Sequence, residues 1–382
     1  GFSLVFTSPT EQWEQKVSNI QQEDSELTAT FRLMSDCEIG LHVLSALWIM
    51  CVGEKIEKEL FPLQDAAKGT TCAKNRTLYA NRIRRTKAGA YNSTSIGTFE
   101  KYLDGYRAWI NDATEAMDHL VRHGKKVVSF STDAAEYFHS IPASILNSKP
   151  FTDKYLKSFE KNSLELLLTS CLSVALKSWE TNTTAALKLS SNVSDVPQLG
   201  LPVGLSCSAV LGNIVLSAFD EAVTEQIKPA FYGRYVDDIT IVMEWHKELD
   251  SPLSVWRWLS TQIPNINVPA KDASQEEQQV SFEVFPLSEH QVEDNSSADG
   301  LSITFKHKKT KLLTADPSSG KRAIDALKHA LRENSSEWRL LTHTPNDPQD
   351  IGPALITALD DAGEPAFRSS QLKTLSSKRS TI

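Results

Sequence analysis

The sequence predicts an α+β protein that contains antiparallel strands, and three stretches carry this prediction. Gly233–Met243 places two adjacent aspartates between apolar, β-branched runs, which is typical of a strand–turn–strand hairpin. Lys126–Ser144 begins with a second short apolar strand. Gln198–Asp220 starts as a glycine-rich turn and continues as an apolar helix. Strands and helices in this mixture predict the α+β class.

Length and composition set broad limits. A chain of 382 residues is too long for one small domain and predicts two or three subdomains. The contents of 40% hydrophobic and 23% charged residues are ordinary for a soluble protein. The five cysteines show no CxxC pairing, which favours a reduced, cytoplasmic compartment without a zinc site or disulfide framework. The apolar run Leu41–Val52 is far short of a membrane span, so we expect no membrane association.

The charges are segregated along the chain, although the net charge is −8. Cys72–Phe99 carries six Lys and Arg residues and no acid, and a second basic cluster occupies Lys306–Lys328. These segments are where phosphates are expected to lie. Asp272–Asp299 carries eight acids and no Lys or Arg. The acidic stretch predicts either an attachment surface for another subunit or a solvated loop.

The elements before the hairpin follow from periodicity. Residues 1–70 are predicted to be mainly helical, with Ile39–Leu60 as a buried packing helix. Thr98–Arg122 is a predicted helix that leads into the Asp133 strand. Thr152–Thr181 is predicted to be mostly helical, and the polar stretch Thr181–Val196 to be a loop.

After the hairpin, helices and strands alternate with turn signals. The predicted elements are a short helix at Ser251–Gln262, a β-hairpin of Val280–Phe285 and Leu301–Phe305 joined through Asn295–Gly300, a lysine-rich strand at Lys306–Leu313, a turn and boundary at Asp316–Gly320, and helices at Lys321–Arg332 and Ile351–Asp360.

The paired aspartates are the strongest chemical signal. A lone Asp-Asp pair is equally compatible with a solvated turn, but the flanks of Asp237 and Asp238 are too apolar for an ordinary surface turn. A half-buried hairpin holds two carboxylates rigidly, and oxygen ligands suit a hard divalent cation such as Mg²⁺, with Mn²⁺ as the alternative. Asp133, at the end of the earlier strand, supplies the third carboxylate.

The order of these motifs resembles that of reverse transcriptases. The strand with Asp133 comes first, the LPVG turn Leu201–Gly204 with its helix follows, and the YVDD hairpin Tyr235–Asp238 comes last. The resemblance covers the chain from about Tyr79 to Leu341. It is nearest to the prokaryotic abortive-infection and defence-associated classes, whose features here are Pro202–Gly204, Leu211–Leu216, Arg234–Asp238 and Trp338–Leu341.

The resemblance implies a right-hand polymerase with fingers, a ferredoxin-like antiparallel palm and a helical thumb. The fingers would be discontinuous and comprise residues 1–118 and 143–197. The palm would comprise 119–142 and 198–315, and 316–382 would form the thumb or the start of a C-terminal helical region.

The resemblance also implies residue roles. Asp133, Asp237 and Asp238 would be the catalytic metal ligands, and Ala134 would add its backbone carbonyl. Phe138 would be the steric gate that excludes a sugar 2′-hydroxyl. The other implied nucleotide contacts are Gly204, Ser208 and one of Lys309 and Lys311.

The basic stretch has two interpretations. Arg82, Arg84 and Arg85 would hold the template backbone or the nucleotide triphosphate, or they would form a solvated charged face. Two departures from the usual family pattern concern the nucleotide: Val203 replaces a glutamine and Ala209 replaces a proline. Because valine cannot donate a hydrogen bond, we expect unusual nucleotide selection or template dependence.

The implied activity is RNA-directed DNA polymerisation by two-metal-ion catalysis in bacterial antiphage defence. Its partners would be dNTPs, an RNA template or DNA product, and a non-coding RNA or partner subunit, with oligomerisation open. Template-independent or protein-primed DNA synthesis is the alternative within the fold. Outside the polymerases, the alternatives are an inactive palm-fold nucleic-acid-binding module and a nucleotidyl cyclase or primase-like palm.

Overall fold

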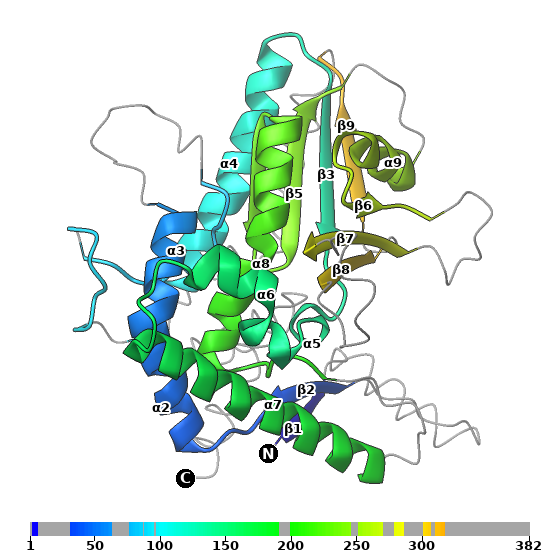
Figure 1. The fold of residues 1–382 in the computed structure, drawn as a ribbon. Coiled ribbons are helices and arrows are strands. Elements are labelled where there is room, and N and C mark those ends of the chain that lie inside the picture. The colour runs from blue at the N-terminus through cyan, green and yellow to red at the C-terminus, as the bar shows by residue number, and fades with distance from the viewer. Residues whose placement is uncertain are drawn as a thin grey trace, which may run out of the picture. The chain divides into compact units, whose positions relative to one another are not determined.

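The structure is a computed structural model that describes residues 2–6, 31–62, 76–86, 88–94, 97–190, 199–245, 251–269, 279–285, 301–306 and 310–317 (Figure 1). The chain divides into two compact units. The first unit comprises Gly1–Asp36 and Arg322–Ile382, and the second comprises Cys37–Lys321. The predicted fingers, palm and thumb boundaries stay a prediction.

The first unit contains a strand pair that the sequence prediction missed. β1 (Phe2–Phe6) pairs antiparallel with β2 (Phe31–Ser35), with Phe2 opposite Ser35. Residues 1–70 were expected to be mainly helical. Each strand has five residues, and runs this short cannot be assigned by periodicity alone because their hydrogen-bond partners lie far away in sequence.

The predicted helix Ile39–Leu60 is confirmed as α2 (Ile39–Trp48), a π-helical turn η1 (Ile49–Gly53) and α3 (Glu54–Leu60). One side is buried in the core, and the other leaves several large apolar side chains exposed: Ile39, Val43, Leu47 and Met50. By length and composition alone, Ile39–Leu60 and Ser206–Ile227 each meet the criterion for a membrane-spanning helix. A core helix of a soluble protein meets the same criterion, and Ser206–Ile227 is 72% buried.

A four-stranded antiparallel sheet forms the centre of the second unit, in the order β4 (Phe231–Tyr235), β5 (Asp238–Glu244), β3 (Val127–Asp133), β9 (Lys311–Ala315). The predicted strand and hairpin are therefore confirmed, and so is the α+β class. Every residue of β4 is buried, as are all but the ends of β5. Strands this apolar must be covered on both faces.

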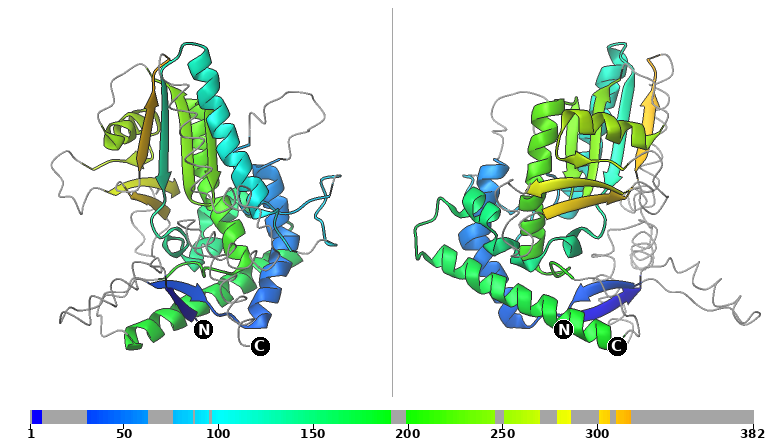
Figure 2. Two further views of the ribbon diagram at one scale, coloured as in Figure 1. Left: turned by 180° about the vertical axis from the view of Figure 1, so that it is seen from behind. Right: turned by 45° about the vertical axis from the view of Figure 1, so that its right-hand side comes forward.

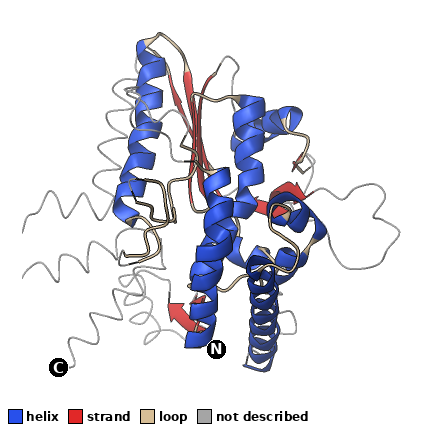
Figure 3. Cartoon of the chain, turned by 60° about the vertical axis from the view of Figure 1, so that its left-hand side comes forward, coloured by secondary structure: helices blue, strands red, loops and turns tan. Residues whose placement is uncertain are grey.

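Helices cover both faces of the sheet beside β4 (Figure 3). Adjacent residues of a strand point to opposite faces. On one face α4 (Tyr102–Arg122) packs against β4, and Trp109 Nε1 donates to the Gly233 carbonyl at 3.1 Å. On the other face Arg234 reaches α8 (Ser206–Ala222). The sheet therefore presents its strand ends, rather than its faces, for chemistry.

The helix before the LPVG turn is longer than predicted. α7 spans Leu164–Ser190, so the first part of the predicted loop Thr181–Val196 is helical. Thr183 is buried on this extension. The extension also contains Ala, Leu and Lys, which favour helix, so the Ser/Thr content misled the prediction. Short turns precede α7: η2 (Ala143–Asn147), α6 (Lys149–Phe151) and η3 (Thr152–Leu156).

A second sheet of β6 (Ile266–Asn267), β7 (Gln279–Phe285) and β8 (Leu301–Lys306) confirms the predicted hairpin (Figure 2). The predicted helix at Ser251–Gln262 is α9 (Pro252–Gln262), which begins at the N-cap Ser251 with proline in its first turn. Trp256 of α9 stacks on Phe305 of β8 at 4.9 Å and meets Phe130 of β3 edge-on at 5.1 Å. These aromatic contacts join the two sheets into one core.

Several predicted features lie outside the described residues. The predicted strand Lys306–Leu313 corresponds to the end of β8 and the start of β9, with 307–309 not described. Also outside are Asn295–Gly300, most of Asp316–Gly320, Lys321–Arg332, Trp338–Leu341 and Ile351–Asp360.

Candidate active site

The three predicted carboxylates meet at one end of the four-stranded sheet. β4 and β5 are joined by a two-residue turn, Val236–Asp237, which the pair Tyr235 and Asp238 closes. Asp133, the last residue of β3, lies directly opposite Asp238, the first residue of β5. The Ala134 amide donates to the Asp237 carbonyl at 3.3 Å. Asp237 is therefore in the turn, whereas Asp238 is already in the strand.

Val236 has a backbone φ of +60°, which is an outlier for a β-branched residue. A conformation of this kind costs energy and persists only where surrounding contacts hold it. One such contact is present: Arg234 Nη1 donates to the Val236 carbonyl at 3.1 Å. The turn that carries Asp237 is thus held from inside the protein.

The carboxylates repel one another electrostatically. Burial, with the charges of Asp238 and Asp133, raises the pKa of Asp237 well above its usual range. In the part of the chain that the structure describes, no three His, Cys, Asp or Glu side chains are already arranged as a metal-binding group. The donor set still fits a hard cation, because it consists of carboxylate oxygens that a divalent charge would relieve of their repulsion.

A buried arginine supports the hairpin. Arg234 is fully buried, and its Nε donates to both carboxylate oxygens of Asp220 on α8, at 2.7 and 2.9 Å. Its Nη2 donates to the Asn213 carbonyl at 2.8 Å. The sequence analysis assigned no role to Asp220 or Asn213. The sequence did contain one sign of these partners: Arg234 is a charged residue within an apolar strand, and a buried arginine requires a buried acceptor.

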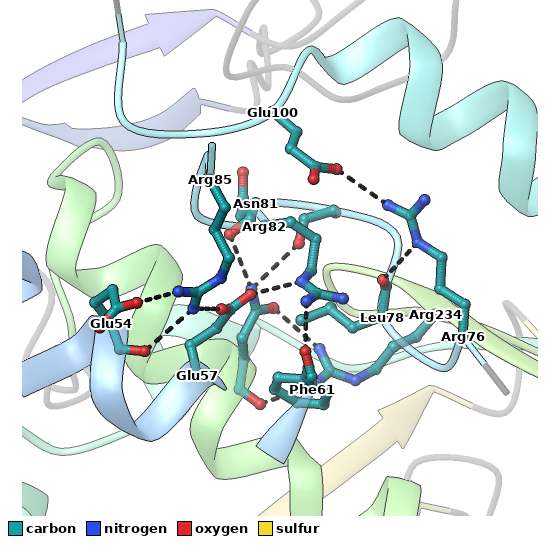
Figure 4. Close-up of polar contacts among 12 residues, drawn as sticks. Glu54, Glu57, Phe61, Arg76, Leu78, Asn81, Arg82, Arg85, Glu100 and Arg234 are labelled. Atoms are coloured by element: carbon teal, nitrogen blue, oxygen red, sulfur yellow. Dashed lines mark hydrogen bonds and ion pairs between the residues drawn. The ribbon is translucent and has the colours of Figure 1, made fainter. Parts of the chain in front are cut away.

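The same network reaches the basic stretch (Figure 4). Asn213 Nδ2 donates to the Ala80 carbonyl at 3.2 Å, next to the segment that carries Arg82. Arg82 is buried, and its Nε donates to Glu57 of α3 at 2.5 Å. Arg85 Nη2 donates to the other oxygen of Glu57 at 2.5 Å.

These contacts correct the prediction for Arg82 and Arg85. Both were expected to hold template or triphosphate, or to lie on a solvated face. The structure instead gives them carboxylate partners on α3, including a second ion pair between Arg85 and Glu54. A run of basic residues does not reveal such partners, because Glu57 lies on a separate helix. Arg84 is half-buried, and its backbone pairs with Thr98 and Asn92.

Arg82 and Arg84 are therefore expected to behave differently on substitution by glutamine. Arg82→Gln leaves the Glu57 carboxylate short of a buried partner and should destabilise the fold by about 3 kcal/mol in urea unfolding. Arg84→Gln, at a predicted phosphate contact, should make template binding less dependent on salt. An unchanged salt slope and nucleotide KM in Arg84→Gln would leave the solvated-face interpretation of that residue.

Of the expected nucleotide contacts, Phe138 lies in the short helix α5 (Tyr137–Ser140). Phe138 is half-buried, and its carbonyl accepts from the Leu201 amide of the LPVG turn at 2.8 Å. Gly204 has φ +107°, a conformation that other residues rarely adopt, which explains a glycine in this turn. Ser208 is buried in the first turn of α8, and its hydroxyl has no partner among the described residues.

Of the two predicted lysines, the structure describes Lys311. It is exposed at the start of β9, directly opposite Ser131, which lies two residues before Asp133 on the same face of β3. Lys309, the other predicted candidate, lies outside the described residues.

A comparison with family profiles agrees with this geometry. Residues 73–265, half of the chain, match the family described as reverse transcriptase (RNA-dependent DNA polymerase). The chain belongs to the reverse transcriptase family. The match includes Asp133, the LPVG turn and the YVDD hairpin, but ends before Lys311. No curated protein matches the chain.

Family membership makes the chain a nucleotidyltransferase, an RNA-directed DNA polymerase. It also implies dNTP substrates, a nucleic-acid template and a palm fold, within which the four-stranded sheet and its carboxylate end are placed. Reverse transcriptases generally use divalent metal ions such as Mg²⁺. In this reverse transcriptase, the carboxylate end of the sheet is the candidate active site.

Proposed function

We propose that this reverse transcriptase extends a 3′-hydroxyl with dNTPs by two-metal-ion catalysis at Asp133, Asp237 and Asp238. The observation that carries the proposal is the register of β3 and β5, which sets Asp133 opposite Asp238 beside the Asp237 turn. These three carboxylates and the Ala134 carbonyl would hold Mg²⁺ or Mn²⁺. Bound there, the metals would lower the pKa of the attacking hydroxyl and would neutralise charge on the leaving pyrophosphate.

The chain's own residues would position the reactants. The paired ends of β3 and β5, and the Val236–Asp237 turn that Arg234 contacts, hold the carboxylates in place. Gly204 would allow the backbone to approach the nucleotide closely, and Ser208 would lie beneath it. Lys311 and Arg84 would provide positive charge for phosphates.

Phe138 provides the test of the sugar specificity. Phe138→Ala is expected to open the sugar pocket and to raise the use of rNTPs relative to dNTPs by about 10- to 100-fold, because the ring no longer occupies the space of a 2′-hydroxyl. Single-nucleotide incorporation with paired dNTP and rNTP substrates measures this ratio. Tyr137 cannot replace Phe138 as the gate, since its ring is buried and its hydroxyl donates to the Gly212 carbonyl. An unchanged ratio would remove Phe138 from the nucleotide pocket.

We further propose that the enzyme acts in the cytoplasm of a prokaryote, in defence against phage. The support is the resemblance of Pro202–Gly204, Leu211–Leu216 and Arg234–Asp238 to the abortive-infection and defence-associated classes. A non-coding RNA or a partner subunit would complete the system. The acidic stretch Asp272–Asp299 would be where a subunit attaches; apart from Gln279–Phe285 it lies outside the described residues.

Untemplated or protein-primed DNA synthesis is a second candidate, and Val203 favours it. Its side chain lacks the hydrogen-bonding group with which glutamine would contact the nucleotide. Sequencing the nucleic acid that copurifies with the enzyme distinguishes the two candidates, with Asp238→Asn as the control. Complementarity to an RNA supports templated synthesis. DNA of random sequence, or DNA linked to tyrosine, supports the second candidate, and the same yield from Asp238→Asn would contradict both.

A further inference from the structure

Gly212 of α8 lies directly beneath the two aromatic rings of α5. A Cβ atom at Gly212 would lie 3.1 Å from Phe138 Cε1 and 3.1 Å from Tyr137 Cε1. Both distances are shorter than ordinary carbon–carbon contact. The rings therefore rest on the backbone of α8, and this approach is available only because residue 212 has no side chain.

Tyr137 joins the two elements with a hydrogen bond. Its buried hydroxyl donates to the Gly212 carbonyl at 2.5 Å. Burial raises the pKa of Tyr137, so the phenol keeps the proton that it donates. The rest of the segment is held as well, since the Ala135 amide donates to Thr304 of β8 at 2.7 Å and the Phe138 carbonyl accepts from Leu201.

The neighbouring turn approaches the segment as closely. A Cβ atom at Gly200 would lie 2.2 Å from the Ile141 carbonyl oxygen and 2.5 Å from that of His139. The backbone around Phe138 is thus fixed on several sides by backbone contacts. The contact of its ring with α8 then sets how far the ring extends.

We infer that Gly212, together with the Tyr137 hydroxyl bonded to it, is a positioning residue that sets the depth of the Phe138 ring in the sugar pocket and thereby the preference for deoxyribonucleotides. The inference rests on the proposed role of Phe138 as the gate. A side chain at position 212 would displace the ring away from α8. A displacement of a few tenths of an ångström matters, because discrimination depends on whether one hydroxyl group fits.

The test is Gly212→Ala in the full chain, measured by steady-state incorporation of dNTPs and rNTPs. Pushing the ring into the pocket should raise the KM for dNTPs by about tenfold, with a smaller change in kcat. In a Phe138→Ala background the added methyl group still contacts Tyr137 but has no Phe138 ring to push into the pocket, so the KM increase should disappear. A KM increase of equal size with and without the Phe138 ring would overturn the inference.

Gly53→Ala is the matched control. A Cβ atom at Gly53 would lie 3.1 Å from Val210 Cγ1 of α8 and 3.1 Å from Trp48 Cζ3, so it crowds the same helix equally without touching Phe138. Gly53→Ala should lower Tm and keep the wild-type KM and dNTP preference. If both alanine variants raise KM alike, the effect comes from general crowding of α8 and the inference fails.

Tyr137→Phe keeps the test decisive if Gly212→Ala does not fold. It removes the hydroxyl that bonds to Gly212 and keeps the ring. The loosened Phe138 should admit rNTPs more readily, while an unchanged preference would contradict the positioning role. If Phe138 is not the gate at all, the result is different: Phe138→Ala alone would then leave the preference for dNTPs over rNTPs unchanged.

Discussion

Asp238→Asn is expected to lower dNTP incorporation by at least about 10³-fold while leaving the fold intact, and Asp237→Asn should do the same. Each substitution removes an anionic oxygen from the end of the sheet and keeps the side-chain volume. Asp238 is exposed and Asp237 is held in a two-residue turn, so neither change removes core packing. Primer extension at saturating Mg²⁺ measures the loss, and thermal unfolding checks the fold.

The matched control is Asp153→Asn, at an exposed i,i+4 ion pair with Lys149 away from the sheet end. It should retain full incorporation, since an exposed pair of this kind contributes little. Incorporation near the wild-type level in Asp237→Asn and Asp238→Asn, with normal melting, would show that these carboxylates do not carry the reaction.

Arg234→Met is expected to have the largest effect on stability, a loss of about 3–5 kcal/mol in the free energy of unfolding. Methionine fills much of the space but leaves the Asp220 carboxylate buried. Among the described residues, the Tyr232 hydroxyl would then be the side chain that still donates a hydrogen bond to it. It also removes the donor that holds the Val236 carbonyl. Urea unfolding measures the loss at constant m-value.

Arg234→Lys separates charge from geometry. A lysine can still pair with Asp220 but lacks the planar fork that also reaches Asn213 and Val236. We therefore expect partial recovery of stability and a lower kcat than in wild type, because the turn carrying Asp237 is no longer braced. Full recovery of both quantities in Arg234→Lys would mean that the bond to Val236 does not position the turn.

The carboxylate trio could be predicted because each part has a local signature. Short apolar, β-branched runs mark the strands, and Asp237 and Asp238 interrupt an apolar hairpin where a turn belongs. Antiparallel pairing then limits where Asp133 can meet them, and the structure places it opposite Asp238. Gly204 was also predictable, since a turn with positive φ requires glycine.

Other features of the fold could not be predicted from the local sequence pattern. Thr181–Ser190 looks like a polar loop, yet it continues α7: its Ala, Leu and Lys residues favour helix, and Thr183 is buried. The strands β1 and β2 were missed because a strand of five residues depends on a partner outside its own window. For β1 and β2, long-range pairing decided the outcome.

The sequence by itself determined the candidate active site: the order of Asp133, the LPVG turn and the YVDD hairpin, and with it the family. Only the tertiary structure decided which basic residues are paired with buried carboxylates. Arg82 and Arg234 read alike as charges in a sequence, but each is buried against a carboxylate from a different helix, Glu57 or Asp220. The physical reason is that turn and strand preferences act over a few residues, whereas the partner of a buried charge is chosen by packing.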